Sequence, residues 1–417
     1  MNEQIKQRIT QLNNGEVPNG YEKTEIGTFP VGWKTTTLDK LLEFKNGVNA
    51  DKEKYNSGVK MISVMDILTD SPIYYDKIKG QVDIDEKTLD TYSVTYGDIL
   101  FQRSSETFED AGKSNVYLDK DRTATYSGFV IRGKKKAHYN PYFLNEALRI
   151  GQVRNQIIRN AAGSQHINVG QDSLAKIIVP LASNVEQSNI AEILMKWDEA
   201  IELYKALINE MDKKRAFIIR QIVSKKAAWK VYSFFDILEE RIEYSKVNNQ
   251  HEVLSSTKQG LFAQNEYFDK QVASENNIGY KVIREGDLVL SPQNLWLGNI
   301  NYNNSFEIGM VSPSYKVFKI KDGFDKTLVS TIMKLPIMLH KYVLSSEQGA
   351  SVVRRNLNMD LFYQITISLP GSEEQQKLGN VIAMINKQIL LYQKQYDVLI
   401  HQRKTLQQYL LNGIVRV

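Results

Sequence analysis

Two long amphipathic helices, repeated at a fixed offset, constrain the fold of this chain more than any other feature. Apolar residues recur in alternating steps of four and three from Ile190, and the same pattern returns from Leu378 without an insertion or deletion. This spacing averages 3.5 residues per turn, which is typical of a coiled-coil seam. The first seam comprises Ile190, Leu194, Trp197, Ile201, Tyr204, Ile208, Met211 and Ile218, and the second comprises Leu378, Ile382, Ile385, Ile389, Tyr392, Tyr396, Leu399 and Leu406. An offset kept along the whole helix indicates an internal duplication.

Each seam is long enough to require a partner, and the matching seam supplies one within the same chain. At about 1.5 Å per residue, the stretch from Ile190 to Ile222 would be roughly 48 Å long. Arg215 and Arg403 are the polar positions that the two seams share, and we expect them to fix the register of the helix pair.

Both helices begin with the same pattern. Asn184 and Gln187 have the spacing of a capping box, and Ser372 and Gln375 repeat it. In such a box each side chain bonds a free backbone donor of its own helix. We therefore expect both pairs to cap the helices in which they lie.

Composition narrows the class of protein. A chain of 417 residues favours two or three domains, and the absence of cysteine excludes disulfides and thiolate metal sites. The polar amino terminus lacks the apolar core of a signal peptide, and no apolar run approaches the length of a membrane span, so we expect a cytoplasmic protein. Lys and Arg total 53 against 48 Asp and Glu, with a pI near 8.9, which permits a polyanionic partner.

Two mixed α+β blocks precede the two helices. The first block has strand-like runs at 59–64 and 94–101, helical spacing over 141–158, and a strand at 176–179 that Pro180 should stop. In the second block, Trp229-Lys230 repeats Trp33-Lys34, and Gly286-Asp287 repeats Gly97-Asp98. The sequence thus predicts an α+β fold, with two mixed α/β domains separated by two long antiparallel coiled-coil helices and related by a pseudo-twofold repeat. The expected boundaries are 1–182 and 228–370 for the domains, and 183–227 and 371–417 for the helices.

A family resemblance rests on specific motifs. The motifs are the run from Tyr21 to Gly27 followed by Pro30 and Gly32-Trp33, the two Gly-Asp-hydrophobic turns, and the twin units in which proline precedes Glu-Gln and a long helix. Together they resemble the DNA specificity subunit of a type I restriction-modification system over essentially the whole chain. The resemblance implies that each block is a target recognition domain and that the helices form a spacer that also docks methyltransferase subunits.

The resemblance also implies a division of labour. This chain would be a non-catalytic reader of a bipartite, asymmetric site in double-stranded DNA, and it would recruit two adenine methyltransferase subunits and, in the full complex, restriction and translocase subunits. S-adenosylmethionine would bind to the methyltransferase subunits, and ATP and Mg to the restriction subunit. Three alternatives remain: a DNA reader in another phage-defence system, an autonomous DNA-modifying enzyme with diverged motifs, and a structural coiled-coil adaptor.

Candidate DNA-binding residues lie in the loops and strand ends of both blocks. Lys and Arg can contact phosphates, whereas Gln, Asn and Arg can form paired hydrogen bonds with base edges in the major groove. The candidates are Gln102, Arg103, Lys113, Arg132, Lys134, Lys135, Lys136, Gln165, His166 and Asn168 in the first block, and Gln293, Asn294, Asn299, Arg354, Arg355 and Asn356 in the second. Solvated strand ends and ordinary turn chemistry explain the same residue types.

Enzyme motifs are weak. The run from Gly128 to Lys134 has the outline of a phosphate-binding loop, but Lys135 stands where Ser or Thr would hold magnesium. Asn140-Pro141-Tyr142 lacks the second proline of the amino-methyltransferase signature, and the five histidines show no metal-ligand spacing. We therefore expect no catalytic residue, no bound cofactor and no metal in this chain.

Overall fold

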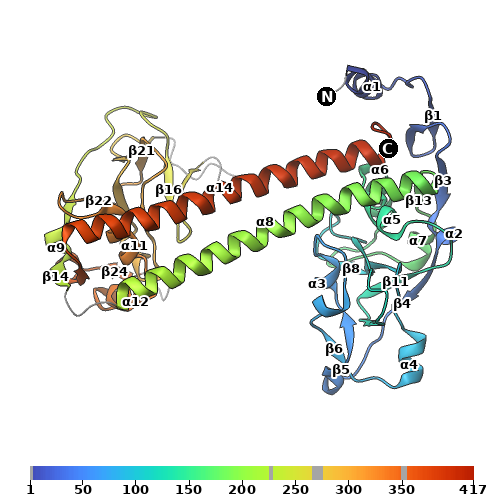
Figure 1. The fold of residues 1–417 in the computed structure, drawn as a ribbon, viewed down its shortest axis with the longest axis horizontal. Helices are drawn as coiled ribbons and strands as arrows, with labels where there is room; N and C mark the ends of the chain where they lie inside the picture. Colours follow the sequence, from blue (N-terminus) through green and yellow to red (C-terminus); the bar gives the residue numbers. More distant parts are fainter. Residues whose placement is uncertain (1–2, 225–228, 265–275, 349–354) are drawn as a thin grey trace. The chain divides into compact units, whose positions relative to one another are not determined.

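The computed structural model describes residues 3–224, 229–264, 276–348 and 355–417, which fall into two compact units. Unit 1 comprises 1–205 with 395–417, and unit 2 comprises 206–394. The two longest helices are α8 (Asn184–Ser224) and α14 (Ser372–Leu411), and each contributes one part to each unit (Figure 1). Strands and helices are present in both units, so the predicted α+β class is confirmed.

Both units contain the same four-stranded antiparallel sheet. In unit 1 its order is β4 (Leu42–Asn46), β11 (Val130–Lys135), β7 (Ile99–Gln102) and β9 (Ser114–Val116). In unit 2 its order is β15 (Leu238–Glu240), β22 (Lys316–Ile320), β19 (Asp287–Leu290) and β20 (Ile300–Tyr302). The internal repeat therefore extends from the helices to the sheets of the two domains.

The remaining elements surround these sheets. Unit 1 also contains α1 (Glu3–Asn13), β1 (Tyr21–Thr24), β2 (Gly27–Pro30), β3 (Lys34–Thr37), α2 (Leu38–Leu41), η1 (Lys52–Lys54), β5 (Tyr55–Ile62), α3 (Val64–Ile67), η2 (Tyr75–Lys77), β6 (Gln81–Val82), α4 (Glu86–Thr91), β8 (Ser104–Ser105), β10 (Thr125–Tyr126), α5 (Pro141–Ala147), α6 (Gly151–Arg159), β12 (Ile167–Asn168), α7 (Gln171–Ala175) and β13 (Ile178–Leu181). Unit 2 also contains β14 (Lys230–Ser233), α9 (Phe234–Ile237), β16 (Leu254–Ser256), β17 (Leu261–Ala263), β18 (Lys281–Arg284), η4 (Leu295–Leu297), β21 (Ile308–Val311), α11 (Lys326–Met333), α12 (Pro336–Leu344), β23 (Ser346–Gln348), β24 (Arg355–Leu357), α13 (Met359–Gln364) and β25 (Thr366–Leu369).

The repeated Gly-Asp pair makes the same turn at the start of the second sheet strand in each unit. Gly97 and Gly286 have φ values of 92° and 91°, which favour glycine because a Cβ is strained there. The following aspartates, Asp98 and Asp287, are each only 1 % exposed. Each accepts a hydrogen bond from the backbone N–H three residues earlier, at 3.0 and 2.8 Å. Burial raises the pKa of Asp98, against the backbone hydrogen bonds that favour its charged form.

A two-stranded ladder joins each domain to the strand that leads into its long helix. Strand β3 pairs with β13 in unit 1, and β14 pairs with β25 in unit 2, both antiparallel. This pairing explains why Trp33-Lys34 and Trp229-Lys230 recur. The prediction that Pro180 ends its strand is wrong, because Pro180 lies within β13, opposite Thr35. A proline is tolerated there since the sheet has only two strands and each strand is an edge.

In unit 1 the long helices run antiparallel. Asp198 of α8 pairs with Arg403 of α14, and Glu186, earlier in α8, pairs with Arg416, beyond the end of α14. The core of the domain continues into this helix pair, because Phe143 of α5 belongs to the same buried cluster as Ile190, Leu194 and Leu410.

In unit 2 the helices pair in the same sense. Arg215 donates a hydrogen bond to Asn386 at 3.2 Å, and Ile218, later in α8, shares a core cluster with Ile382, earlier in α14. The predicted antiparallel coiled coil is thus confirmed. All sixteen residues of the two seams are buried or half-buried, whereas Leu203 and Met384, which lie outside the seams, are each 70 % exposed.

The predicted capping boxes are wrong. Gln187 and Gln375 are only 2 % and 3 % exposed, and neither side chain bonds back to the start of its own helix. Gln187 accepts a hydrogen bond from the backbone N–H of Asn140 at 2.9 Å and donates one to the carbonyl of Ala182 at 2.8 Å.

Gln375, its counterpart in the second long helix, repeats this arrangement. It accepts from the N–H of Asp325 at 3.1 Å and donates to the carbonyl of Pro370 at 2.9 Å. Asn140 and Asp325 are the N-cap residues of α5 and α11, so each glutamine fastens a domain helix to the start of a long helix. We call this repeated contact the glutamine clasp.

The two seam arginines have different surroundings. Arg403 pairs with Glu146 at 2.7 Å and with Asp198 at 2.8 Å, and its Nη2 donates to the Tyr142 hydroxyl at 2.9 Å. Glu146 is 1 % exposed and also accepts from Gln407 at 2.8 Å. Although burial opposes its charge, these anionic and polar neighbours raise the pKa of Arg403.

At the equivalent place in unit 2, Arg215 meets fewer anions. It bonds the amide of Asn386, the counterpart of Asp198, and pairs with Asp212 of its own helix at 2.7 Å. Burial lowers the pKa of the nearby Lys334, and the positive charge of Arg215 lowers it further. Arg403 is therefore the centre of a buried ionic cluster in unit 1, whereas Arg215 makes a half-exposed polar contact in unit 2.

Candidate nucleic-acid interface

The structure brings several predicted residues of unit 1 together where β7 ends. Gln102, the last residue of β7, pairs with Val130 of β11, and its N–H donates to the carbonyl of Lys113 at 2.8 Å. Directly after it, β8 pairs with β12, which places Ser104 opposite Asn168. We define the first edge as residues 102–105, 128–130 and 165–168. Strand pairing therefore brings three segments that are distant in sequence to one edge.

Side chains on the first edge have different roles. Gln102 is 5 % exposed, and its Nε2 donates to the carbonyl of Ser104 at 2.9 Å, while its Oε1 has no hydrogen-bond partner within the described residues. Gln165, His166 and Asn168 are exposed, and the Asn168 side chain is held by the Ser104 hydroxyl and by the carbonyl of His166. Gln102 thus supports the edge, whereas Gln165, His166 and Asn168 are available to a ligand.

Four basic candidates lie in or directly after β11: Arg132, Lys134, Lys135 and Lys136. At 3.4 Å per residue, Arg132 lies about 7 Å along β11 from Val130, and Lys135 lies about 17 Å from it. Arg132 is 5 % exposed, stacks over Tyr126 at 5.5 Å and donates to the carbonyl of Ser93. Burial lowers the pKa of Lys135, whose ammonium lies 5.0 Å from the Tyr139 ring. Lys134 and Lys136 are exposed, so these two remain available for phosphate contact.

Unit 2 has an equivalent edge, which we define as residues 291–294 with 355–356. The N–H of Arg355 lies 3.4 Å from the carbonyl of Gln293, and its guanidinium bonds the hydroxyl and carbonyl of Ser346. Gln293 and Asn356 are exposed and Asn294 is half-buried. This second edge follows β19 as the first edge follows β7.

One further candidate of unit 2 does not belong to this surface. Asn299 is 6 % exposed and bonds Ser256 through both side-chain atoms, at 2.7 and 2.9 Å. Arg354 lies outside the described residues. For every candidate in both units, contact with DNA stays a prediction.

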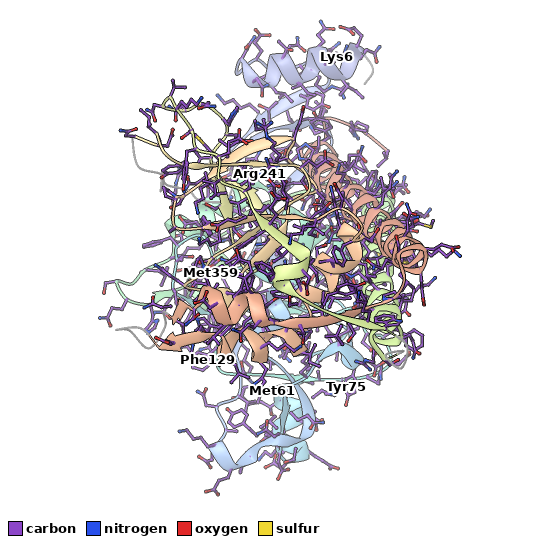
Figure 2. The ribbon with its side chains drawn as sticks, turned by 90° about the vertical axis from the view of Figure 1, so that its left-hand side faces the viewer. Lys6, Met61, Tyr75, Phe129, Arg241 and Met359 are labelled. Carbon is purple, nitrogen blue, oxygen red and sulfur yellow. The ribbon has the colours of Figure 1, made fainter. Side chains whose placement is uncertain are left out.

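Sequence reasoning missed one residue of the first edge. Phe129 directly precedes β11 and is 67 % exposed (Figure 2). Its place between Gly128 and a buried strand gave no signal, because a phenylalanine beside a valine-isoleucine run is usually part of the core. Only the geometry shows it beside Arg103, whose N–H donates to the carbonyl of Phe129.

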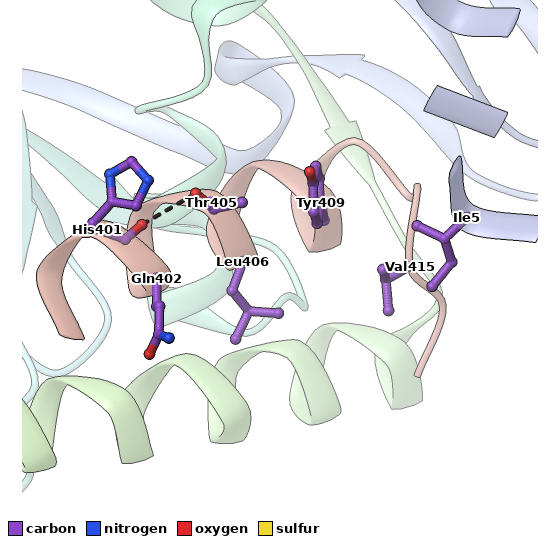
Figure 3. Close-up of a pocket in the computed structure, with 7 residues that line it drawn as sticks. All are labelled: Ile5, His401, Gln402, Thr405, Leu406, Tyr409 and Val415. Carbon is purple, nitrogen blue, oxygen red and sulfur yellow. Dashed lines mark hydrogen bonds between the residues drawn. The ribbon is translucent and has the colours of Figure 1, made fainter. Parts of the chain in front are cut away.

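The residues that the structure describes also bear on metal binding and membrane insertion. They contain no group of three His, Cys, Asp or Glu that could hold a metal ion, and no helix among them is both long and apolar enough to cross a membrane. An open groove of about 440 Å³ lies in unit 1, and none of the candidate DNA-binding residues lines it (Figure 3). Its lining is Ile5, His401, Gln402, Thr405, Leu406, Tyr409 and Val415.

Comparisons with known proteins point in one direction. The model of a family described as the type I restriction modification DNA specificity domain matches residues 30–213. The chain is 23 % identical over 423 residues to the putative type I restriction enzyme MjaX specificity subunit of Methanocaldococcus jannaschii, covering 95 % of this chain and 97 % of the relative.

Solved structures share the fold. The S subunit of the type I restriction-modification system from M. genitalium superposes with a TM-score of 0.57 at 14 % identity, covering 95 % of this chain and 97 % of that one. A chain from a study of complex assembly and conformational transition of a type I restriction-modification system gives 0.52 at 12 % identity, covering 93 % and 99 %.

Proposed function

We propose that this chain, which belongs to the family of type I restriction-modification DNA specificity subunits, reads DNA for its complex and does no chemistry itself. Each domain would recognise one half of a bipartite, asymmetric site in double-stranded DNA. Two methyltransferase subunits would bind S-adenosylmethionine and modify adenine, and restriction and translocase subunits would bind ATP and Mg. The complex would act in the cytoplasm, where its DNA substrate is found.

One observation carries the proposal. The same four-stranded sheet occurs twice, and the loops at its equivalent edges differ in chemistry. The first edge exposes Asn168, Gln165 and His166, whereas the second exposes Gln293 and Asn356. Because such side chains read base edges by hydrogen bonding, two different edges favour two different half-sites. An asymmetric target is the expected consequence.

The helices support the second part of the proposal. Half-sites on one face of DNA are separated by about 34–36 Å per turn of the duplex, and a helix pair of roughly 48 Å could hold two readers that far apart. Val381, Met384 and Leu391 lie outside the seam of α14 and are 43 %, 70 % and 49 % exposed. Exposed apolar residues at this spacing favour the docking of a further helix, which we assign to a methyltransferase subunit.

Mapping of adenine methylation tests the proposal. The chain would be expressed with its methyltransferase subunits in a host that lacks other adenine methylation, and the methylated positions would be read by long-read sequencing. We expect one motif of two short blocks with a constant gap, and its loss when this chain is omitted. A continuous motif, or methylation that persists without this chain, would contradict the proposal.

A further inference from the structure

The first edge presents an aromatic ring to solvent. Phe129 is 67 % exposed, although it directly precedes Val130 and Ile131, which are fully buried. Single exposed apolar residues are common on protein surfaces, so exposure alone carries no function. What distinguishes Phe129 is how firmly its turn is held and which polar residues belong to the same edge.

Hydrogen bonds on one side fix the turn of Phe129. The carbonyl of Phe129 accepts from the N–H of Arg103 at 2.9 Å, and the carbonyl of Gly128 accepts from the Arg103 guanidinium at 3.2 Å. One arginine thus holds two consecutive carbonyls of the turn.

Close packing fixes the other side. Val48 forms a parallel bridge with Ser127, and the N–H of Gly47 donates to the carbonyl of Val130 at 3.1 Å. A Cβ on Gly128 would lie 1.7 Å from Oδ1 of Asn49, so the Asn49 side chain packs directly against the turn. The ring of Phe129 therefore projects from a backbone that is restrained on both sides.

The neighbours of Phe129 decide what it can bind. Arg103 and Ser104 lie on the same edge, and Asn168 is opposite Ser104 in the β8–β12 ladder. Arg and Asn form base-specific paired hydrogen bonds in the major groove of DNA. An aromatic ring on that edge would enter the same groove, where the apolar feature of a base pair is the C5 methyl group of thymine.

We propose that Phe129 is a specificity-determining residue that recognises a thymine methyl group in the half-site read by unit 1. This inference rests on the proposed function. Recognition by unit 1 is then partly hydrophobic: Phe129 favours a base pair that carries the methyl group, while polar side chains of the same edge bond other base edges. The half-site of unit 1 must then contain a thymine in one of its strands.

Unit 2 differs at the equivalent position. Phe101 and Leu290 each lie four residues after the glycine of the Gly-Asp turn. Phe101 is opposite Ile131 in unit 1, and Leu290 is opposite Lys316 in unit 2. Phe129 lies two residues before Ile131, and Ser314 lies two residues before Lys316, so these two positions are equivalent. Ser314 is exposed. A serine cannot replace the apolar contact, so the contact should be confined to one half-site.

The test uses the complex of the whole chain with its methyltransferase subunits. The probes are duplexes that carry the methylation-mapped motif, with each thymine replaced in turn by deoxyuridine, which lacks only the C5 methyl group. We expect the loss of one methyl group in one half-site to weaken binding about fourfold, as burial of one methyl group implies. In the Phe129→Ala complex the same replacement should not change the binding affinity. In the Phe129→Leu complex part of the dependence on the methyl group should remain.

Controls separate this contact from general damage. Phe235→Ala removes another phenylalanine that is 67 % exposed, but in unit 2, where it packs on Tyr363, and it should leave the dependence on the methyl group intact. The salt dependence of binding should be the same for Phe129→Ala and the unsubstituted chain, because no phosphate contact is lost.

Two results would overturn the inference while leaving the proposed function in place. One is a Phe129→Ala complex that binds the motif with unchanged affinity and unchanged dependence on each methyl group. The other is an unsubstituted complex that is insensitive to deoxyuridine at every thymine of both half-sites. An unsubstituted complex that prefers no split site would overturn the proposed function and this inference together.

Discussion

Arg403 and Arg215 have the same place in two copies of one helix, yet the structure uses them differently. Arg403 neutralises the buried Glu146 and bonds Asp198, whereas Arg215 faces the amide of Asn386. Removing one partner of a buried ion pair leaves an uncompensated charge, which costs far more than the loss of an exposed pair. The arginine at this shared position should therefore contribute more to the stability of unit 1 than to that of unit 2.

This inequality gives a prediction with an internal control. Arg403→Met keeps most of the side-chain volume in the seam but leaves Glu146 with Arg149, 3.2 Å away, in place of two arginines, and it should lower the free energy of unfolding by about 3 kcal/mol, the low end of the range for a broken buried ion pair. Arg215→Met should cost less than about 1 kcal/mol. Chemical denaturation of the whole chain, followed by circular dichroism, would compare the two. Equal losses would show that Arg403 does not sit in a buried ionic centre.

The glutamine clasp makes a second prediction. Gln375→Leu would remove the hydrogen bonds to the N–H of Asp325 and the carbonyl of Pro370, and leaving such buried groups unpaired costs about 1–3 kcal/mol. Gln376→Leu, on the exposed neighbour, should have little effect. Hydrogen exchange measured by mass spectrometry should show faster exchange at the start of α11 in Gln375→Leu alone. Unchanged exchange there would mean that the clasp does not hold α11.

Individual polar residues were the least predictable from sequence. Gln102, Arg132 and Asn299 have the side chains expected of a DNA-binding surface, yet each is at most 6 % exposed and bonds groups within its own domain. Residue type is the same whether a polar group supports a loop or faces a ligand. Only the packing of distant segments decides between the two, and a single sequence does not report it.

At the scale of elements, prediction succeeded where periodicity or backbone chemistry dictates structure. The heptad spacing of the seams predicted the helices α8 and α14, because it determines each core position. The Gly-Asp pairs marked the turns before β7 and β19 because a positive φ there requires glycine. The continuous helix expected over 141–158 is instead α5 and α6, with Ile150 as the extended N-cap of the second. The prediction of the helix caps failed because Gln187 and Gln375 bond partners that are far away in the sequence.

The direction of the helix pair has a direct test, because the chain contains no cysteine to interfere. Leu194 and Leu406 pack in the same cluster of unit 1, so cysteines at these two positions should form a disulfide on oxidation. In a parallel pair, Leu194 would instead face Ile382, its counterpart in the second seam. A disulfide between cysteines at 194 and 382, and none between 194 and 406, would contradict the antiparallel arrangement.

At the scale of the whole molecule, two domains share one pair of long helices. Each long helix is shared between the units, since α8 passes from unit 1 to unit 2 after Lys205 and α14 returns after Lys394. The repeat was predictable because one constant offset relates every seam position of the first helix to its counterpart in the second. The sequences of the half-sites were not predictable, because the loops at the two edges follow no common pattern.

The length of the helix pair is the most direct test of this account. Seven residues inserted after Lys205 and seven after Lys394 would keep both heptad patterns and lengthen the pair by about 10.5 Å. At about 3.4 Å per base pair, methylation mapping should then show a gap that is longer by about three base pairs, between two unchanged half-sites. An unchanged gap, or new half-sequences with the old gap, would contradict the claim that the helices set the distance between the two readers.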